Sequence, residues 1–125
     1  MINNLAGKKA PKEILENIEE LIEAYYVNKP DINIQSQKVS FGTSGHRGNS
    51  KKSSFNENHI LAITQALCEY RKNAGITGVM HIGIDTHAFS TPAQETELQV
   101  FLANEVQCKI AAKKSYTTNP VMSFT

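Results

Sequence analysis

The stretch that most constrains the fold is GVMHIGI, residues 78–84, a nearly continuous apolar run that ends at an aspartate. Such a run is typical of a strand that is covered on both faces of its sheet. Residues 56–73 before it and residues 91–102 after it carry apolar side chains at helical spacing. The next segment, 106–112 (VQCKIAA), alternates apolar and polar residues and predicts a half-exposed strand.

A further short strand is predicted at residues 38–41 (KVSF), which completes a strand–helix–strand–helix–strand series. Connections of this kind run between parallel strands as right-handed crossovers. We therefore expect an α/β fold, a mostly parallel βαβαβ sheet flanked by helices. Asn56 is expected to cap the first of these helices and Gly75 to stop it, whereas Thr91 would cap the second and Pro92 fill its first position.

An N-terminal amphipathic helix is predicted over residues 11–26, ahead of the sheet. Pro11 suits its first turn and Pro30 closes the segment, while glutamates occupy the polar side. We interpret this helix as a docking element. The chain is accordingly divided into residues 1–35, the helix with its connection, and residues 36–125, the α/β domain. The apolar stripe of the helix consists of Ile14, Leu15, Ile18, Leu21, Ile22, Tyr25 and Tyr26.

Composition excludes several classes of protein. Lys and Arg number 13 against 12 Asp and Glu, so the formal charge of +1 favours neither nucleic acid nor an anionic membrane. The first residues lack the apolar core of a signal peptide, and no run of about 18 apolar residues occurs. We therefore expect a cytoplasmic protein without a membrane or nucleic-acid partner. Cys68 and Cys108 lack metal-ligand spacing and are expected to be buried thiols, not a disulfide or metal site.

Three polar loops follow the predicted strands: GTSGHRG (42–48), DTHAFS (85–90) and KKSYTTN (113–119). The carboxyl ends of parallel strands meet at one edge of a sheet, and ligands of α/β proteins bind at that edge. We therefore expect the three loops to gather there.

The glycine loop, residues 42–48, matches neither a P-loop nor a dinucleotide fingerprint. A hydrolase elbow is also disfavoured, because Ser44 is followed directly by Gly45 and then His46. What remains is an anion cradle, in which small residues let backbone N–H groups approach an oxyanion and Arg47 grips a phosphate. Spacing alone leaves a flexible surface loop with a solvated arginine equally open.

Other candidate residues carry weaker signals. Asp85 is interpreted as satisfying backbone donors or pairing with a cation, in preference to a chemical role. A metal site built from His81, Asp85 and His87 is disfavoured, because His81 lies inside an apolar strand whose neighbours alternate faces. Lys51 and Lys52 are expected to be solvated, with attraction of an anionic ligand as the alternative.

The string FGTSGHRG, followed by SFNENHILAITQAL, resembles the first domain of the α-D-phosphohexomutases, in particular the bacterial phosphoglucomutase branch of that family. The likeness covers most of residues 20–106. It continues through AYYVNKP (24–30), NAGITG (73–78), IGIDTHAFSTPA (82–93) and VFLANEV (100–106).

The resemblance implies a four-domain enzyme that uses Mg²⁺ and a phosphoserine to interconvert glucose 1-phosphate and glucose 6-phosphate through a bisphosphorylated sugar. The glycine loop would line the cleft beside the phosphoserine. By that match Arg47 would contact the phosphoryl group, and Thr43, Ser44, Gly45 and His46 would shape the same wall.

Several of the family's motifs are absent from these 125 residues, including the T-x-S-H-N-P phosphoserine loop, the metal loop and the sugar loop. Ser115 and Ser123 lack the following His-Asn-Pro. We therefore expect an N-terminal fragment of domain I that has no catalytic serine or Mg²⁺ ligand and is inactive alone. The alternative is a non-catalytic fragment that binds a sugar phosphate or docks onto a partner. The open sheet edge and apolar end (Val121, Met122, Phe124) also predict self-association.

Overall fold

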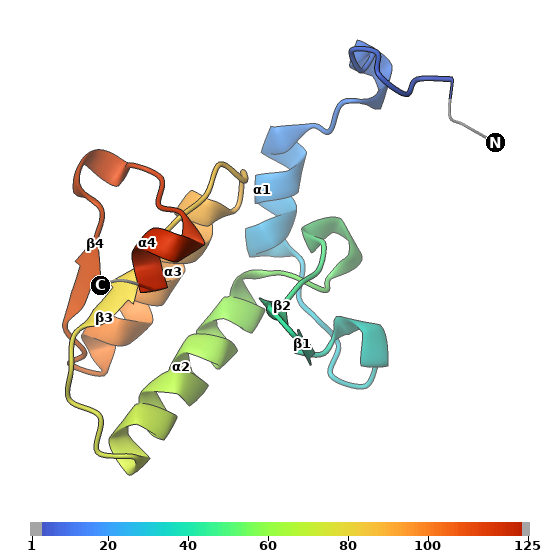
Figure 1. Cartoon of the computed structure of the whole chain (residues 1–125). Coiled ribbons are helices and arrows are strands. Elements are labelled where there is room, and N and C mark those ends of the chain that lie inside the picture. Colours follow the sequence, from blue (N-terminus) through green and yellow to red (C-terminus); the bar gives the residue numbers. More distant parts are fainter. Residues whose placement is uncertain (1–3, 124–125) are drawn as a thin grey trace.

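The computed structural model describes residues 4–123, and Figure 1 shows the order of its elements. Phe124, part of the predicted apolar end, lies outside these residues. Within the described residues, one short 3-10 turn precedes α1 and three more lie between the later helices and strands. The helices are α1 (Ile18–Val27), α2 (Glu57–Asn73), α3 (Ser90–Ala103) and α4 (Asn119–Ser123), and the strands are β1 (Phe41–Gly42), β2 (Gly45–His46), β3 (Met80–Ile82) and β4 (Cys108–Ile110).

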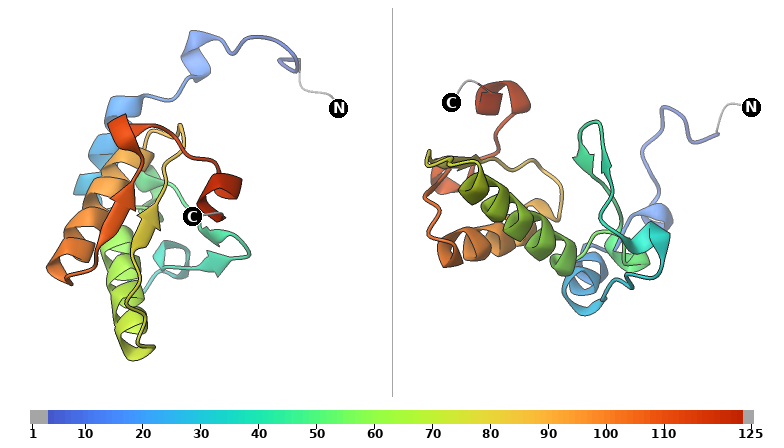
Figure 2. Two further views of the ribbon diagram at one scale, coloured as in Figure 1. Left: turned by 60° about the vertical axis from the view of Figure 1, so that its left-hand side comes forward. Right: turned by 90° about the horizontal axis from the view of Figure 1, so that it is seen from below.

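β3 and β4 form a parallel pair joined through α3, as the sequence predicts. Met80 lies opposite Cys108 in this register, and Ile82 lies opposite Ile110. Figure 2 (left) shows α2 and α3 along one side of the pair and α4 on the other. Beneath the helices, Cys68, Ile82 and Phe101 form a buried apolar cluster. The α/β class and the parallel crossover are confirmed.

The first predicted strand differs from the expectation. β1 pairs with β2 in an antiparallel hairpin, with Phe41 opposite His46 and Gly42 opposite Gly45. Within the described residues this hairpin does not join the β3–β4 sheet. The physical reason is proximity, because a partner three residues away closes a loop at far lower entropic cost than one some forty residues away. Gly45, at φ +120°, permits the tight return of the chain.

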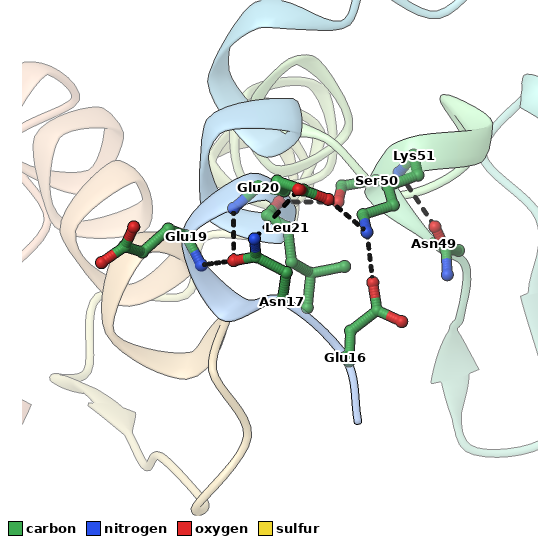
Figure 3. A network of polar contacts seen from close by, with 8 residues as sticks. All are labelled: Glu16, Asn17, Glu19, Glu20, Leu21, Asn49, Ser50 and Lys51. Carbon is green, nitrogen blue, oxygen red and sulfur yellow. Dashed lines mark hydrogen bonds and ion pairs between the residues drawn. The ribbon is translucent and has the colours of Figure 1, made fainter. Parts of the chain in front are cut away.

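α1 begins at Ile18, not at residue 11 as predicted. The side chain of Asn17 caps the helix, because its Oδ1 accepts hydrogen bonds from Glu19 N (3.1 Å) and Glu20 N (3.3 Å), as Figure 3 shows. Lys12–Ile14 forms a separate 3-10 turn. The N-terminal third of the predicted stripe is therefore exposed and outside the helix.

The helix α1 docks onto its own chain. Leu21 and Tyr25 pack with Ile60 of α2 and with Phe89, which precedes α3. Tyr25 is fully buried, and its hydroxyl donates to Thr96 Oγ1 at 3.0 Å. The surface on which α1 docks thus belongs to the same chain. The division of the chain into residues 1–35 and 36–125 stays a prediction.

Two fully buried polar residues, Ser50 and Asn56, connect α1 with the start of α2 through hydrogen bonds. Ser50 Oγ donates to Leu21 O at 2.8 Å. Asn56 Nδ2 donates to Ala24 O at 2.7 Å and to Ser50 O at 3.2 Å. Asn56 also occupies the N-cap position of α2, where the sequence predicts it.

The remaining boundaries lie close to the predicted ones. Gly75 follows α2 at φ +66°, which suits its expected role as a stop. α3 begins at Ser90, one residue before the predicted cap Thr91. Both cysteines are free; Cys68 is buried, whereas Cys108 is only half-buried because β4 lies partly open to solvent. Among the described residues, no helix combines the length and the apolar character needed to cross a membrane.

Candidate functional site

The glycine loop forms the tip of the β1–β2 hairpin, which projects from the body of the domain (Figure 2, right). Thr43 and Ser44 connect the two strands, and both are exposed. A hollow of about 390 Å³ lies against the hairpin. Its lining consists of Ser40, Gly42, Thr43, Ser44, Gly45 and Arg47.

A second cavity, of about 520 Å³, lies between the end of the hairpin and the loop that follows β3. Arg47 lines both cavities and therefore lies where they meet. The second cavity is lined by His46, Arg47, Gly48, Phe55, Asp85, His87, Phe89, Ser90 and Ala93. The structure therefore brings the first two of the three predicted loops together.

The third loop reaches the second one. Thr117 N donates to Ile84 O at 2.9 Å, at the end of the segment that begins with β3. Gly83 permits this approach, because a Cβ at that position would overlap Thr117 Oγ1. The loop after β3 thus lies between the other two. It shares a cavity with the glycine loop and a hydrogen bond with the third loop.

Tight backbone packing fixes the position of Arg47. The next residue, Gly48, lies so close to Ser54 that an added Cβ would stand 2.5 Å from the Ser54 carbonyl carbon. Asn49 N donates to Ser54 Oγ at 2.9 Å, and Ser54 N donates to Asn49 O at 3.1 Å. These contacts close the chain into a small loop directly after Arg47.

His46 is held by other rings. Its ring centroid lies 5.1 Å from that of His59 and 5.7 Å from that of Phe55, with interplanar angles of 22° and 8°. Its Nδ1 atom lies 3.1 Å from Ser40 N. Sequence reasoning did not single out His59 or Phe55. The available signal was that His59 stands three residues after the N-cap Asn56, where capping boxes place a side-chain acceptor.

Asp85 organises the loop after β3. Its Oδ1 atom accepts hydrogen bonds from the Ser90 hydroxyl and from His87 N, the latter at 2.9 Å. The Ser90 hydroxyl and then the His87 N–H hold the pKa of this carboxyl below its ordinary value. This geometry agrees with the interpretation that Asp85 satisfies local donors. Across residues 4–123, no three His, Cys, Asp or Glu side chains gather as a metal site.

Lys51 is exposed, as predicted, and its side chain also forms ion pairs. Its Nζ atom lies 2.5 Å from Glu16 Oε1 and 3.2 Å from Glu20 Oε2, at the start of α1 (Figure 3). Hydrogen bonds to these two carboxylates raise the pKa of Lys51. Its charge therefore serves the attachment of α1, and Arg47 remains the cation of the cavity.

Comparison with known proteins agrees with this geometry. Residues 38–125 match the family model described as phosphoglucomutase/phosphomannomutase, alpha/beta/alpha domain I. A curated phosphoglucomutase from Komagataeibacter xylinus is 56% identical over 122 residues, which is 98% of this chain. The chain spans 22% of the length of that relative. It therefore belongs to the phosphoglucomutase/phosphomannomutase family, through the α/β/α domain I.

Proposed function

We propose that this chain supplies the phosphate-binding wall of a cytoplasmic phosphoglucomutase, an enzyme that interconverts glucose 1-phosphate and glucose 6-phosphate. The observation that carries the proposal is the place of Arg47, where the two cavities beside the glycine loop meet. The family of the chain and the name of its Komagataeibacter relative support the substrate class.

The residues of the wall suit an anionic ligand. A guanidinium can bind two phosphate oxygens at once through parallel N–H donors. Gly45 brings backbone close to the ligand without a side chain in the way, and the hydroxyls of Thr43 and Ser44 are further donors. His46 completes the wall on the side of the second cavity. These donors would stabilise the charge of a phosphoryl group during transfer.

Magnesium does not fit the residues described here. Mg²⁺ requires several oxygen ligands in octahedral geometry. The carboxylate nearest the cavity, Asp85, already accepts two hydrogen bonds from its own loop. We therefore assign the metal of the proposed enzyme, like its phosphoserine, to segments outside this sequence.

The 125-residue chain alone is expected to show no mutase turnover. A coupled assay would convert glucose 1-phosphate and detect glucose 6-phosphate by its oxidation, with and without added Mg²⁺. The reason is that no T-x-S-H-N-P loop, and hence no phosphoryl donor of the family type, occurs in the sequence. Turnover above the enzyme-free background that depends on Mg²⁺ would contradict the proposal.

Phosphate binding is expected to depend on Arg47. Charge-assisted hydrogen bonds contribute roughly 1.5–3 kcal/mol, so Arg47→Ala should weaken binding by about tenfold or more. The measurement is an NMR titration with glucose 1-phosphate that follows the amide signals of Gly45 and residue 47. Lys52→Ala is the matched control, because it removes a cation from the exposed turn nearby and should leave the affinity within about twofold.

The same titration distinguishes a chain that binds phosphate from one that binds no phosphate. Binding without turnover would favour the non-catalytic, phosphate-binding role. An absence of amide shifts at millimolar ligand would count against any phosphate site in this chain. Self-association through the open sheet edge stays a prediction, and size-exclusion chromatography of the same samples measures it.

A further inference from the structure

The ring of His46 packs against a side chain of helix α2. His59 is 3% exposed, and its ring stacks on His46 with 5.1 Å between centroids. The neighbouring Phe55 also stacks on His46, at 5.7 Å. The hairpin itself is short and projects into solvent, with Phe41 64% exposed. Its position over the cavity therefore depends on contacts that α2 provides.

His59 is fixed in both orientation and tautomer. Its Nε2 atom lies 2.7 Å from Gln37 O, and its Nδ1 atom accepts from Asn56 N at 3.0 Å. A carbonyl oxygen can only accept and a backbone N–H can only donate. The proton of the ring thus lies on Nε2, and Nδ1 is the acceptor. One buried side chain ties the N-terminus of α2 to the segment that leads into β1.

The ring of His46 is oriented by the backbone of Ser40. Its Nδ1 atom lies 3.1 Å from both Ser40 N and Ser40 O, so either ring tautomer finds a partner there. The Nε2 atom is buried and has no hydrogen-bond partner within the described part of the chain. Arg47, the next residue, lines both cavities. A displacement of His46 would therefore also displace the backbone of Arg47, to which it is directly bonded.

We propose that His59 is a positioning residue of the phosphate site, which acts by holding the ring of His46 and so placing Arg47. This inference rests on the proposed function for its ligand, although the contact between the two histidines is independent of any ligand. His59 itself does not line either cavity beside the glycine loop. Its effect on binding is therefore indirect.

The side chain of His59 makes two kinds of contact: it accepts a hydrogen bond that caps α2, and its ring stacks on His46. The cap of α2 needs only an acceptor at the position of Nδ1, which a glutamine can supply from the third position of a helix. The support of His46 needs a flat ring face, which a phenylalanine can supply. Two substitutions at His59 thus divide the tasks. His59→Gln keeps the acceptor and removes the ring, whereas His59→Phe keeps the ring and removes both hydrogen bonds.

The test compares these two variants by NMR of the ring protons and by thermal unfolding. In the parent chain, nuclear Overhauser effects should connect the ring protons of His46 with those of Phe55, on which it stacks. In His59→Gln, which keeps the cap of α2, the melting temperature should fall less than in His59→Phe, while these effects weaken. In His59→Phe, the melting temperature should fall further, while these effects persist. His81, in β3, is the internal control and should not change.

The opposite pattern would overturn the proposal. If the contacts between His46 and Phe55 persisted unchanged in His59→Gln, the ring of His59 would not position His46. If these contacts weakened in both variants in proportion to the fall in melting temperature, His59 would be a structural residue only. Neither readout requires a ligand, so the result stands even if the chain binds no phosphate.

The effect on the ligand is then measured by titration with inorganic phosphate and with glucose 1-phosphate. We expect His59→Gln to weaken binding by about threefold to tenfold, the range that loss of an aromatic contact gives, and His59→Phe to weaken it less. Equal affinities in the parent and in His59→Gln would overturn the role of His59 in the phosphate site. No binding by the parent chain would contradict the proposed function itself.

Discussion

Replacement of Tyr25 by alanine is expected to lower the free energy of unfolding by about 3–5 kcal/mol, the usual cost of removing a buried aromatic ring. Tyr25 is fully buried, packs on Phe89 at 5.7 Å between ring centroids, and donates to Thr96. Urea titration followed by circular dichroism at 222 nm measures the change. Such a loss approaches the whole stability of a small domain, so much of the variant should be unfolded in buffer.

The adjacent tyrosine provides the control. Tyr26 lies on the same helix but is 39% exposed, so Tyr26→Ala should cost about 1 kcal/mol or less. A Tyr25→Phe variant isolates the hydroxyl, whose hydrogen bond to Thr96 should contribute about 1 kcal/mol. Equal stabilities of the Tyr25→Ala and Tyr26→Ala variants would show that α1 does not dock as described.

The same burial predicts a response to alkaline pH. Desolvation raises the pKa of Tyr25 to about 12 from its ordinary value of 10.0. A folded-state pKa above the unfolded value means that the stabilisation is complete below pH 10 and is lost as the pH rises toward 12. The absorbance of tyrosinate near 295 nm, recorded during alkaline unfolding, should therefore rise together with the loss of helix.

Gly48→Ala is expected to lower stability by about 1–3 kcal/mol and also to displace Arg47. The added Cβ would stand 2.5 Å from the carbonyl carbon of Ser54, so the backbone must move to accommodate it. Urea titration gives the stability, and the glucose 1-phosphate titration gives the affinity. We expect the loss of affinity to exceed that expected from the unfolded fraction alone.

Gly78→Ala is the matched control for this substitution. A Cβ at Gly78 would meet no atom within 4 Å, so the backbone is free to accept it. The variant should be within about 0.5 kcal/mol of the parent. If Gly48→Ala were equally harmless, the close approach of residues 48 and 54 would be wrong, together with the fixed position of Arg47 that follows from it.

Regular elements with long periodic patterns were predictable from the sequence. The 3.6-residue spacing and the cap residue Asn56 located α2, and the apolar run before a second helical pattern located the parallel crossover through α3. The rule that loops gather at the carboxyl edge of a sheet anticipated the contact between the loops after β3 and β4, whereas the glycine loop reaches this edge from a hairpin outside that sheet.

Local competition produced the differences. Asn17 offers two backbone N–H groups an acceptor, and with this cap α1 starts at Ile18, seven residues later than the predicted start at residue 11. The hairpin of the glycine loop forms because its two strands are adjacent in sequence. A segment of four residues is too short for the spacing of apolar side chains to indicate this pairing. Lys51 pairs with Glu16 and Glu20, which lie about thirty residues away.

The candidate site was proposed from the string GTSGHRG, which led to Arg47 and its neighbours through resemblance. Their location in a binding site and their roles there stay predictions. His59 was not found because its contacts depend on how α2 lies against the hairpin. A side chain that acts on the ligand only through another residue belongs to no motif from which the sequence could identify it.

The hydrogen bond between Tyr25 and Thr96 joins residues 71 positions apart, and it sets an order on synthesis. At about 5–20 residues per second, a ribosome needs roughly 4–14 s to make the chain between them. During that interval the apolar face of α1 has emerged while its receiving surface on α3 does not yet exist. α1 can therefore complete its docking only after Thr96 has been made, and until then part of its apolar face is open to a nascent-chain chaperone.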